Sequence, residues 1–224
     1  LLPGLFVTLL EESGLIETIG EWQVSQAQQL NLYWQKQGMA PLNLSINIPC
    51  SLLLNNKFNA TIDNTISKAG VNPECIELEI HGHCMFENLE EQHQVFQNIR
   101  DRGIKLALKY STSGFPVNFD FSALPIDIIN IDRELTEQIS NNRENRQIMA
   151  TIIGFAHQHQ LQVVAEGVET AEQLIFLNAM HCNAAQGFLL SHPLTLEDFT
   201  KLYQAGKTFN TLIDRIGKQQ SKTV

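Results

Sequence analysis

The sequence predicts a parallel α/β fold of the TIM-type (β/α)8 barrel class, with strands and helices in alternation. Six short apolar runs follow one another along the 224 residues, with segments of helical spacing between them. Nearly continuous apolar runs are typical of strands covered on both faces, as in a parallel sheet. The runs end about 20 to about 34 residues apart, close to the roughly 30 residues of one βα unit. Since six strands are visible, we expect two strands of a full barrel to be missing.

Each predicted strand is an apolar run bounded by polar or turn residues. The runs are residues 42–46, 75–80, 104–108, 126–131 and 161–165, with a weaker one at 182–185. Before the first of them, Pro3 is suited to start a helix that Gly14 closes, because proline is tolerated in a first turn. Residues 19–37 are expected to form a second helix.

Two later helices have recognisable ends. Asn88 is expected to cap a helix that stops at Gly103. Thr170 and Gln173 have the spacing of a capping box, in which each side chain bonds the backbone N–H of the other residue. The pair predicts the start of a helix after the fifth strand.

Composition limits the possible functions. With 43% hydrophobic and 17% charged residues, the chain can bury a full-sized core, and one domain is expected. A net charge of −9 argues against binding duplex nucleic acid, because phosphate contacts need clustered lysine and arginine. Any anionic ligand must therefore be held by a few local groups.

The cellular setting is expected to be reducing and cytoplasmic. The four cysteines, Cys50, Cys75, Cys84 and Cys182, are far apart and form no Cys-x-x-Cys pair. No apolar stretch approaches the roughly 20 residues of a membrane span. The chain starts without methionine and is interpreted as a fragment, which leaves open a membrane anchor elsewhere in the full-length protein.

Polar residues end the predicted strands. Five of the six runs end in an acid or an amide: Asn47, Glu79, Asp132, Glu166 and Gln186. The carboxyl ends of parallel strands converge on one mouth, where such groups suit a metal-assisted phosphoryl site. The remaining run, 104–108, ends instead in Lys109 and Tyr110. A lysine at this position changes the chemistry that the mouth can support.

Five segments carry a distinctive pattern, and Ala-Glu-Gly-Val-Glu-Thr at 165–170 is the most specific part of it. The segments are residues 45–48, 78–80, 124–133, 163–170 and 185–188. In order and spacing they resemble the EAL domains, a family of bacterial cyclic di-GMP phosphodiesterases. The resemblance implies an EAL-like barrel over residues 1–205, with its first two strands upstream of Leu1, followed by a C-terminal helix or tail at 206–224.

The resemblance also assigns roles to the strand-end residues. Four of them resemble residues that hold or surround two divalent ions: Asn47, Glu79, Asp132 and Glu166. Glu169 and Gln186 resemble supporting groups, for which a ligand contact and simple bracing of the loop stay equally open. Taken without the family, a lone acid at a strand end is more often a helix cap or a solvated loop residue.

Other family positions are changed. The metal-bridging aspartate pair is replaced by Lys109 and Tyr110, and the catalytic lysine by Asn130, whose amide cannot shuttle a proton near neutral pH. An acid that steadies the following loop is replaced by Gly82, and the loop itself, residues 111–115, departs from the family pattern. The family's homodimer forms near this loop, so the oligomeric state stays open.

Lys109 is expected to take over the electrostatic role of the metals by pairing with Glu79 and Asp132. An ammonium about 4 Å from a divalent ion would be repelled by on the order of 8 kcal/mol at an effective dielectric constant of about 20. No cofactor is therefore expected, and magnesium or manganese would be needed only by an active phosphodiesterase. Taken alone, Lys109 would be an ordinary solvated lysine.

The histidines offer a different metal-site hypothesis. His81 and His83 follow a strand end and resemble the His-x-His pair of amidohydrolase barrels. That site needs more histidines at the next strand ends, where this chain has Asn130, Asp132 and Glu166 instead. His157 and His159 are two residues apart on a predicted helix, so they do not share a face and are interpreted as surface residues.

Three functions follow from these patterns. The favoured one is an inactive EAL-like regulatory domain that acts through another protein or through neighbouring domains of a larger regulator. A second is a metal-independent receptor for cyclic di-GMP, with Lys109 near a ligand phosphate and Gln186 placing the rest. The third is an active phosphodiesterase with an altered metal site, which the changes at Lys109, Tyr110 and Asn130 disfavour.

Overall fold

The computed structural model describes residues 9–10, 12–69, 72–81, 89–111, 125–140 and 142–205. Within it the chain divides into two compact units, one of residues 1–108 and 120–126 and the other of residues 109–119 and 127–224. Several predictions fall outside the described residues: those for Pro3, Gly82, His83, Cys84 and Asn88, for the loop at 112–115, and for the tail at 206–224.

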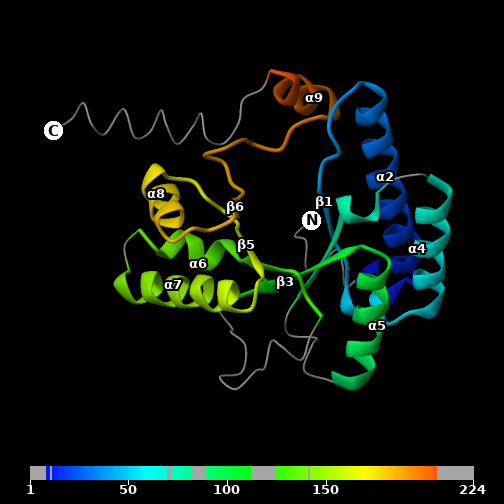
Figure 1. Ribbon diagram of the computed structural model, residues 1–224, viewed down its shortest axis with the longest axis horizontal. Helices are drawn as coiled ribbons and strands as arrows, with labels where there is room; N and C mark the ends of the chain where they lie inside the picture. Colours follow the sequence, from blue (N-terminus) through cyan, green and yellow to red (C-terminus); the bar gives the residue numbers. More distant parts are fainter. Residues whose placement is uncertain are drawn as a thin grey trace. The chain divides into compact units, whose positions relative to one another are not determined.

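The first unit contains the helices and strands that precede residue 109. Its elements are α2 (Ile16–Lys36), β1 (Leu44–Asn47), α3 (Cys50–Leu53), α4 (Asn56–Ala69), β2 (Ile76–His81), α5 (Leu89–Asp101) and most of β3 (Lys105–Tyr110). β1 and β2 pair in parallel, with Asn47 opposite Glu79. Helices α2 and α4 pack against each other (Figure 1). Trp34, Phe58 and Ile62 lie buried in these helices, which gives the unit its own apolar core.

The second unit begins with the last two residues of β3. Its other elements are β4 (Ile128–Ile131), α6 (Arg133–Gln138), α7 (Arg143–Gln158), β5 (Gln162–Ala165), α8 (Ala171–Ala179), β6 (Ala184–Ala185) and α9 (Leu196–Gln204). β4 pairs in parallel with β5, and β5 with β6. Helix α7 packs on α6 and β5 (Figure 1). Its residues Met149, Ile153 and Ala156 are buried.

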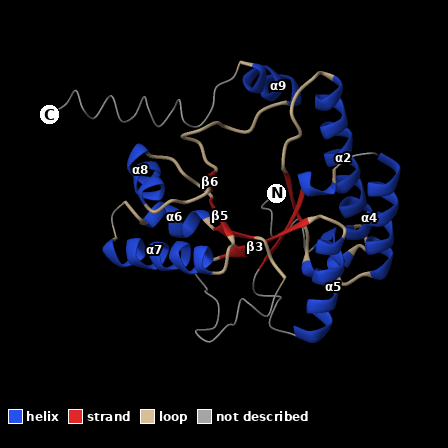
Figure 2. Cartoon of the chain, viewed as in Figure 1, coloured by secondary structure: helices blue, strands red, loops and turns tan. Residues whose placement is uncertain are grey.

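Among the described residues, six strands stand in one sheet in sequence order, and helices follow most of them (Figure 2). Each predicted strand is present, with ends shifted by a few residues. Cys75 lies in a short 3-10 turn, Pro73–Cys75, because Pro73 sits at its first position and the Asn72 side chain accepts a hydrogen bond from the Glu74 N–H. The third strand continues past Leu108 to Tyr110, where the Tyr110 carbonyl accepts the Asp132 N–H at 2.9 Å.

Helix ends agree with the turn chemistry of the sequence. Gly14 and Gly103 have φ of +69° and +85°, the left-handed conformation that glycine adopts at low cost after a helix. The predicted helix at 19–37 starts three residues earlier, at Ile16. The Thr170–Gln173 capping box of α8 is confirmed, with both reciprocal bonds present. Among the described residues, no helix is long and apolar enough to cross a membrane.

Candidate functional site

A lysine and two carboxylates meet at the strand ends of the second unit. The Lys109 Nζ lies 2.7 Å from Glu166 Oε2 and 3.6 Å from Asp132 Oδ2. The three side chains are 15%, 18% and 25% exposed, respectively, so each is largely withdrawn from water. We call Lys109, Asp132 and Glu166 the lysine–carboxylate cluster.

The backbone of three consecutive strands holds the lysine–carboxylate cluster. Lys109 is the penultimate residue of β3, while Asp132 and Glu166 directly follow β4 and β5. The Asp132 N–H donates to the Tyr110 carbonyl at 2.9 Å, and the Glu166 N–H donates to the Ile131 carbonyl at 3.0 Å. Because the ladder continues one residue past each strand, the three side chains emerge at the same edge.

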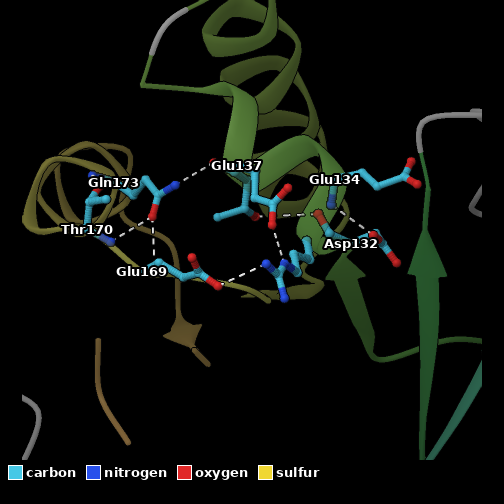
Figure 3. Close-up of polar contacts among 8 residues, drawn as sticks. Asp132, Glu134, Glu137, Glu169, Thr170 and Gln173 are labelled. Atoms are coloured by element: carbon cyan, nitrogen blue, oxygen red, sulfur yellow. Dashed lines mark hydrogen bonds and ion pairs between the residues drawn. The ribbon is translucent and has the colours of Figure 1, made fainter. Parts of the chain in front are cut away.

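Asp132 has two roles at once. Its side chain caps α6 by accepting the Glu134 N–H at 2.9 Å (Figure 3). Its other carboxylate oxygen lies 3.6 Å from the Lys109 Nζ. The helix-cap interpretation of this strand-end acid is therefore correct for Asp132, and a ligand contact for it stays a prediction. The predicted pairing of Lys109 with Asp132 is confirmed, and Glu166 is the closer partner.

Glu169 braces the loop between β5 and α8. Its Oε1 lies 3.1 Å from Arg133 Nη2, and the Arg133 Nε bonds Glu137 one turn along α6 (Figure 3). The two acids raise the pKa of Arg133, with the Glu137 hydrogen bond as the largest cause. The bracing contact of Glu169 is thus present in the structure, and a ligand contact for it stays a prediction.

Gln173 makes a second connection between the same loop and α6. Its side-chain oxygen accepts the Glu169 and Thr170 N–H groups at 2.8 and 2.9 Å, and its amide donates to the Thr136 carbonyl at 3.2 Å (Figure 3). Gln173 is buried, so these bonds are shielded from water. The sequence indicated its capping role but gave no sign of the link to Thr136.

Gln186 and Asn130 differ in exposure. The Gln186 side chain is exposed, while its backbone bonds Ala165 at 2.8 Å and Val168 at 2.9 Å. The next residue, Gly187, cannot be replaced by a residue with a side chain, because a Cβ at this position would lie 2.1 Å from the Val168 carbonyl oxygen. Asn130 is buried on β4, opposite Val164 on β5. Ligand contacts for Gln186 stay a prediction.

In the first unit, Asn47 is the last residue of β1 and pairs with Glu79, which lies two residues before the end of β2. Glu79 is buried and accepts a hydrogen bond from the Ser45 hydroxyl at 3.4 Å, whereas Asn47 is exposed. Glu77, two residues before Glu79 on the same face of β2, is also buried. No role for Glu77 is predicted from the sequence. Since Glu79 and Lys109 belong to different units, their pairing stays a prediction.

The lysine–carboxylate cluster does not fit a divalent ion at Asp132 and Glu166 as these side chains stand. The Lys109 ammonium already bonds Glu166 and faces Asp132. Tyr110, its neighbour, is half-buried, and burial raises the pKa of its hydroxyl, which keeps it neutral and a poor metal ligand. Among the described residues, no group of three or more His, Cys, Asp and Glu side chains could hold a metal ion.

The EAL domain family model matches residues 1–193. The chain belongs to the EAL domain family. It is 30% identical over 197 residues to the signaling protein YkoW of Bacillus subtilis, covering 88% of this chain and 24% of YkoW. It is 28% identical over 205 residues to the cyclic di-GMP phosphodiesterase NbdA of Pseudomonas aeruginosa, covering 90% of this chain and 26% of NbdA. The chain thus spans about a quarter of the length of these relatives.

The fold of this EAL domain agrees with solved structures. The PaMucR phosphodiesterase in its c-di-GMP complex superposes with a TM-score of 0.82 at 26% identity, covering 88% of this chain and 80% of that one. The six parallel strands with their helices match the (β/α)8 barrel type of the family, which confirms the predicted fold class. The domain boundaries at 205 and 206 stay predictions.

Proposed function

We propose that this EAL domain is a catalytically inactive regulatory domain in bacterial cyclic di-GMP signalling, acting through another protein or through neighbouring domains. The observation that carries the proposal is the position of Lys109, whose ammonium lies 2.7 Å from Glu166 and 3.6 Å from Asp132. This cation neutralises charge between two carboxylates that would otherwise serve divalent ions. To bind there, a metal ion would have to displace the Lys109 ammonium, which is covalently attached to the chain.

Two further residues support the loss of catalysis. Asn130 stands where the family carries its catalytic lysine, and an amide has no proton to transfer near neutral pH. Tyr110 stands where the family carries its second bridging aspartate, and its phenol is neutral because burial raises the pKa of the hydroxyl. The site therefore has an ammonium at Lys109, no proton-transferring group at Asn130 and no bridging carboxylate at Tyr110. A single substitution could not restore all three.

Metal-independent cyclic di-GMP binding is the second candidate, supported by the c-di-GMP complex of the PaMucR relative and by the exposed Gln186 amide. The geometry of Lys109 does not favour it, because an ammonium shared by two carboxylates has little positive charge left for a phosphate. Protein contact is therefore the preferred mode, and the span of about a quarter of the relatives' length makes neighbouring domains suitable partners.

Turnover and binding assays separate these functions. We expect no conversion of cyclic di-GMP to the linear dinucleotide in magnesium or manganese, and no binding heat in a chelator. Binding without turnover would identify the receptor, and turnover would refute inactivity. Lys109→Asp combined with Tyr110→Asp should create a manganese-dependent rise in Tm that the wild-type chain lacks. No rise would mean that the surrounding residues no longer suit a metal.

A further inference from the structure

The segment from Glu166 to Glu169 carries one member of the lysine–carboxylate cluster and packs against Arg133. Gly167 has φ of +72°, and a Cβ placed there would lie 2.3 Å from the Arg133 Cγ and 2.6 Å from its Cβ. The aliphatic stem of Arg133 therefore packs against the backbone of the residue that follows Glu166. A long charged side chain commonly buries its stem in this way while its head stays in water.

The guanidinium of Arg133 binds the far end of this segment, at Glu169. It reaches Glu169 at 3.1 Å through Nη2 and Glu137 through Nε. Arg133 also follows Asp132 directly in the chain. Glu166, Glu169, Arg133, Asp132 and Lys109 thus form a closed ring, made of two stretches of backbone and three ion pairs.

The two carboxylates of the cluster are held in different ways. The Asp132 side chain is fixed by the cap bond to the Glu134 N–H, whereas the Glu166 backbone is bonded to the Ile131 carbonyl at 3.0 Å, where the loop to α8 begins. Gln173 secures the later part of that loop, at the N–H groups of Glu169 and Thr170. Arg133 packs beside Gly167, the residue that follows Glu166.

Resting on the proposed role of Lys109 as a tethered cation, we propose that Arg133 is a positioning residue that holds the Glu166 carboxylate against the Lys109 ammonium. A lysine side chain loses rotamer entropy when it is confined, so it stays in one geometry only if its partners are already in place. Without Arg133, Glu169 would lose the 3.1 Å ion pair that ties the loop to α6. The loop would then move away from α6 and draw Glu166 away from Lys109.

The test is the ¹⁵N-resolved NMR signal of the Lys109 ammonium in the 224-residue chain, identified by its absence in Lys109→Met. A buried, bonded ammonium exchanges its protons slowly enough to give such a signal. We expect Arg133→Gln to abolish it while the backbone amide spectrum keeps the dispersion of the folded chain. Glu137→Gln is the matched control, because it removes the other partner of Arg133 and leaves Glu169 in place, so the signal should persist.

An unchanged Lys109 signal in a folded Arg133→Gln chain would overturn the proposal, as would its loss in Glu137→Gln. If Arg133→Gln does not fold, Glu169→Gln provides the same test, since it removes only the 3.1 Å ion pair at a partly exposed site. Loss of the signal in that variant supports the positioning role, and its persistence refutes it. The measurement does not involve turnover, so its outcome is independent of whether the domain is catalytically inactive.

Discussion

Lys109→Met tests the electrostatic role of the lysine–carboxylate cluster most directly, because it keeps the length of the side chain and removes the charge. At an effective dielectric constant of about 20, the separations of 2.7 and 3.6 Å correspond to gross attractions of about 6 and about 5 kcal/mol. Most of this is offset by desolvation of the three groups. Removing the cation leaves Asp132 and Glu166 uncompensated, and we expect a loss of about 3 kcal/mol in unfolding free energy, the lower end for broken buried pairs.

The measurement is urea denaturation followed by far-UV circular dichroism at neutral pH. Lys201→Met is the matched control, because Lys201 pairs with Glu197 at 2.6 Å but the two side chains are 66% and 78% exposed. An exposed pair on one helix contributes about 0.5 kcal/mol or less. Equal losses in the two variants would refute the assigned role of Lys109.

A divalent cation extends the same experiment. Once Lys109 is replaced by methionine, the two carboxylates have no tethered cation, and magnesium that binds only the folded chain should restore part of the lost stability. The wild-type chain should show no such dependence, because its ammonium occupies the position. Equal responses of the two chains to magnesium would show that the ammonium does not exclude the ion.

Three other predictions concern local structure. Gly167→Ala should destabilise the chain by at least about 1 kcal/mol, because Gly167 has a positive φ and an added Cβ would clash with Arg133. Gly154→Ala in α7, where an added Cβ meets nothing within 4 Å, should stabilise the chain by about 0.5–1 kcal/mol. Thermal denaturation of both variants checks these two effects. Asp132→Ala should cost about 1 kcal/mol more than Asp132→Asn, because asparagine keeps the α6 cap, and urea denaturation would show no difference if the cap is unimportant. Burial raises the pKa of Cys182 from 9.0 to about 11, so its alkylation at pH 8 should be about a hundredfold slower in the folded than in the unfolded chain, as measured by mass spectrometry. Because the folded pKa is the higher one, the stability that this thiol contributes is present below pH 9 and is lost as pH rises toward about 11.

Several features were predictable because their causes are local in the sequence. Apolar runs identify each strand that the structure describes, and the Thr170–Gln173 capping box depends on residues three apart. The end of the third strand was predicted too early, at Leu108. Lys109 and Tyr110 look like loop residues by composition, but pairing with the chain at Asp132 keeps them in β3. A bond to a distant segment cannot be seen in a local pattern.

The site was predictable in its residue types and less so in its contacts. The sequence predicted Lys109 beside Asp132, since adjacent parallel strands bring their ends together. It did not predict Glu166 as the closest partner, or any role for Arg133. A signal for Arg133 existed in the i, i+4 spacing to Glu137 on α6, but that spacing is equally common on solvated helix surfaces.

The sequence by itself determined the alternation of strands and helices and the chemical groups at each strand end, because both depend on residue type and short-range spacing. Only the tertiary structure decided which carboxylate Lys109 bonds. That choice depends on the loop after β5, which Gly167, Arg133 and Gln173 hold against α6 through contacts between residues about 35 positions apart. Contacts at such separations form only when the strands are in register, so no local pattern could specify them.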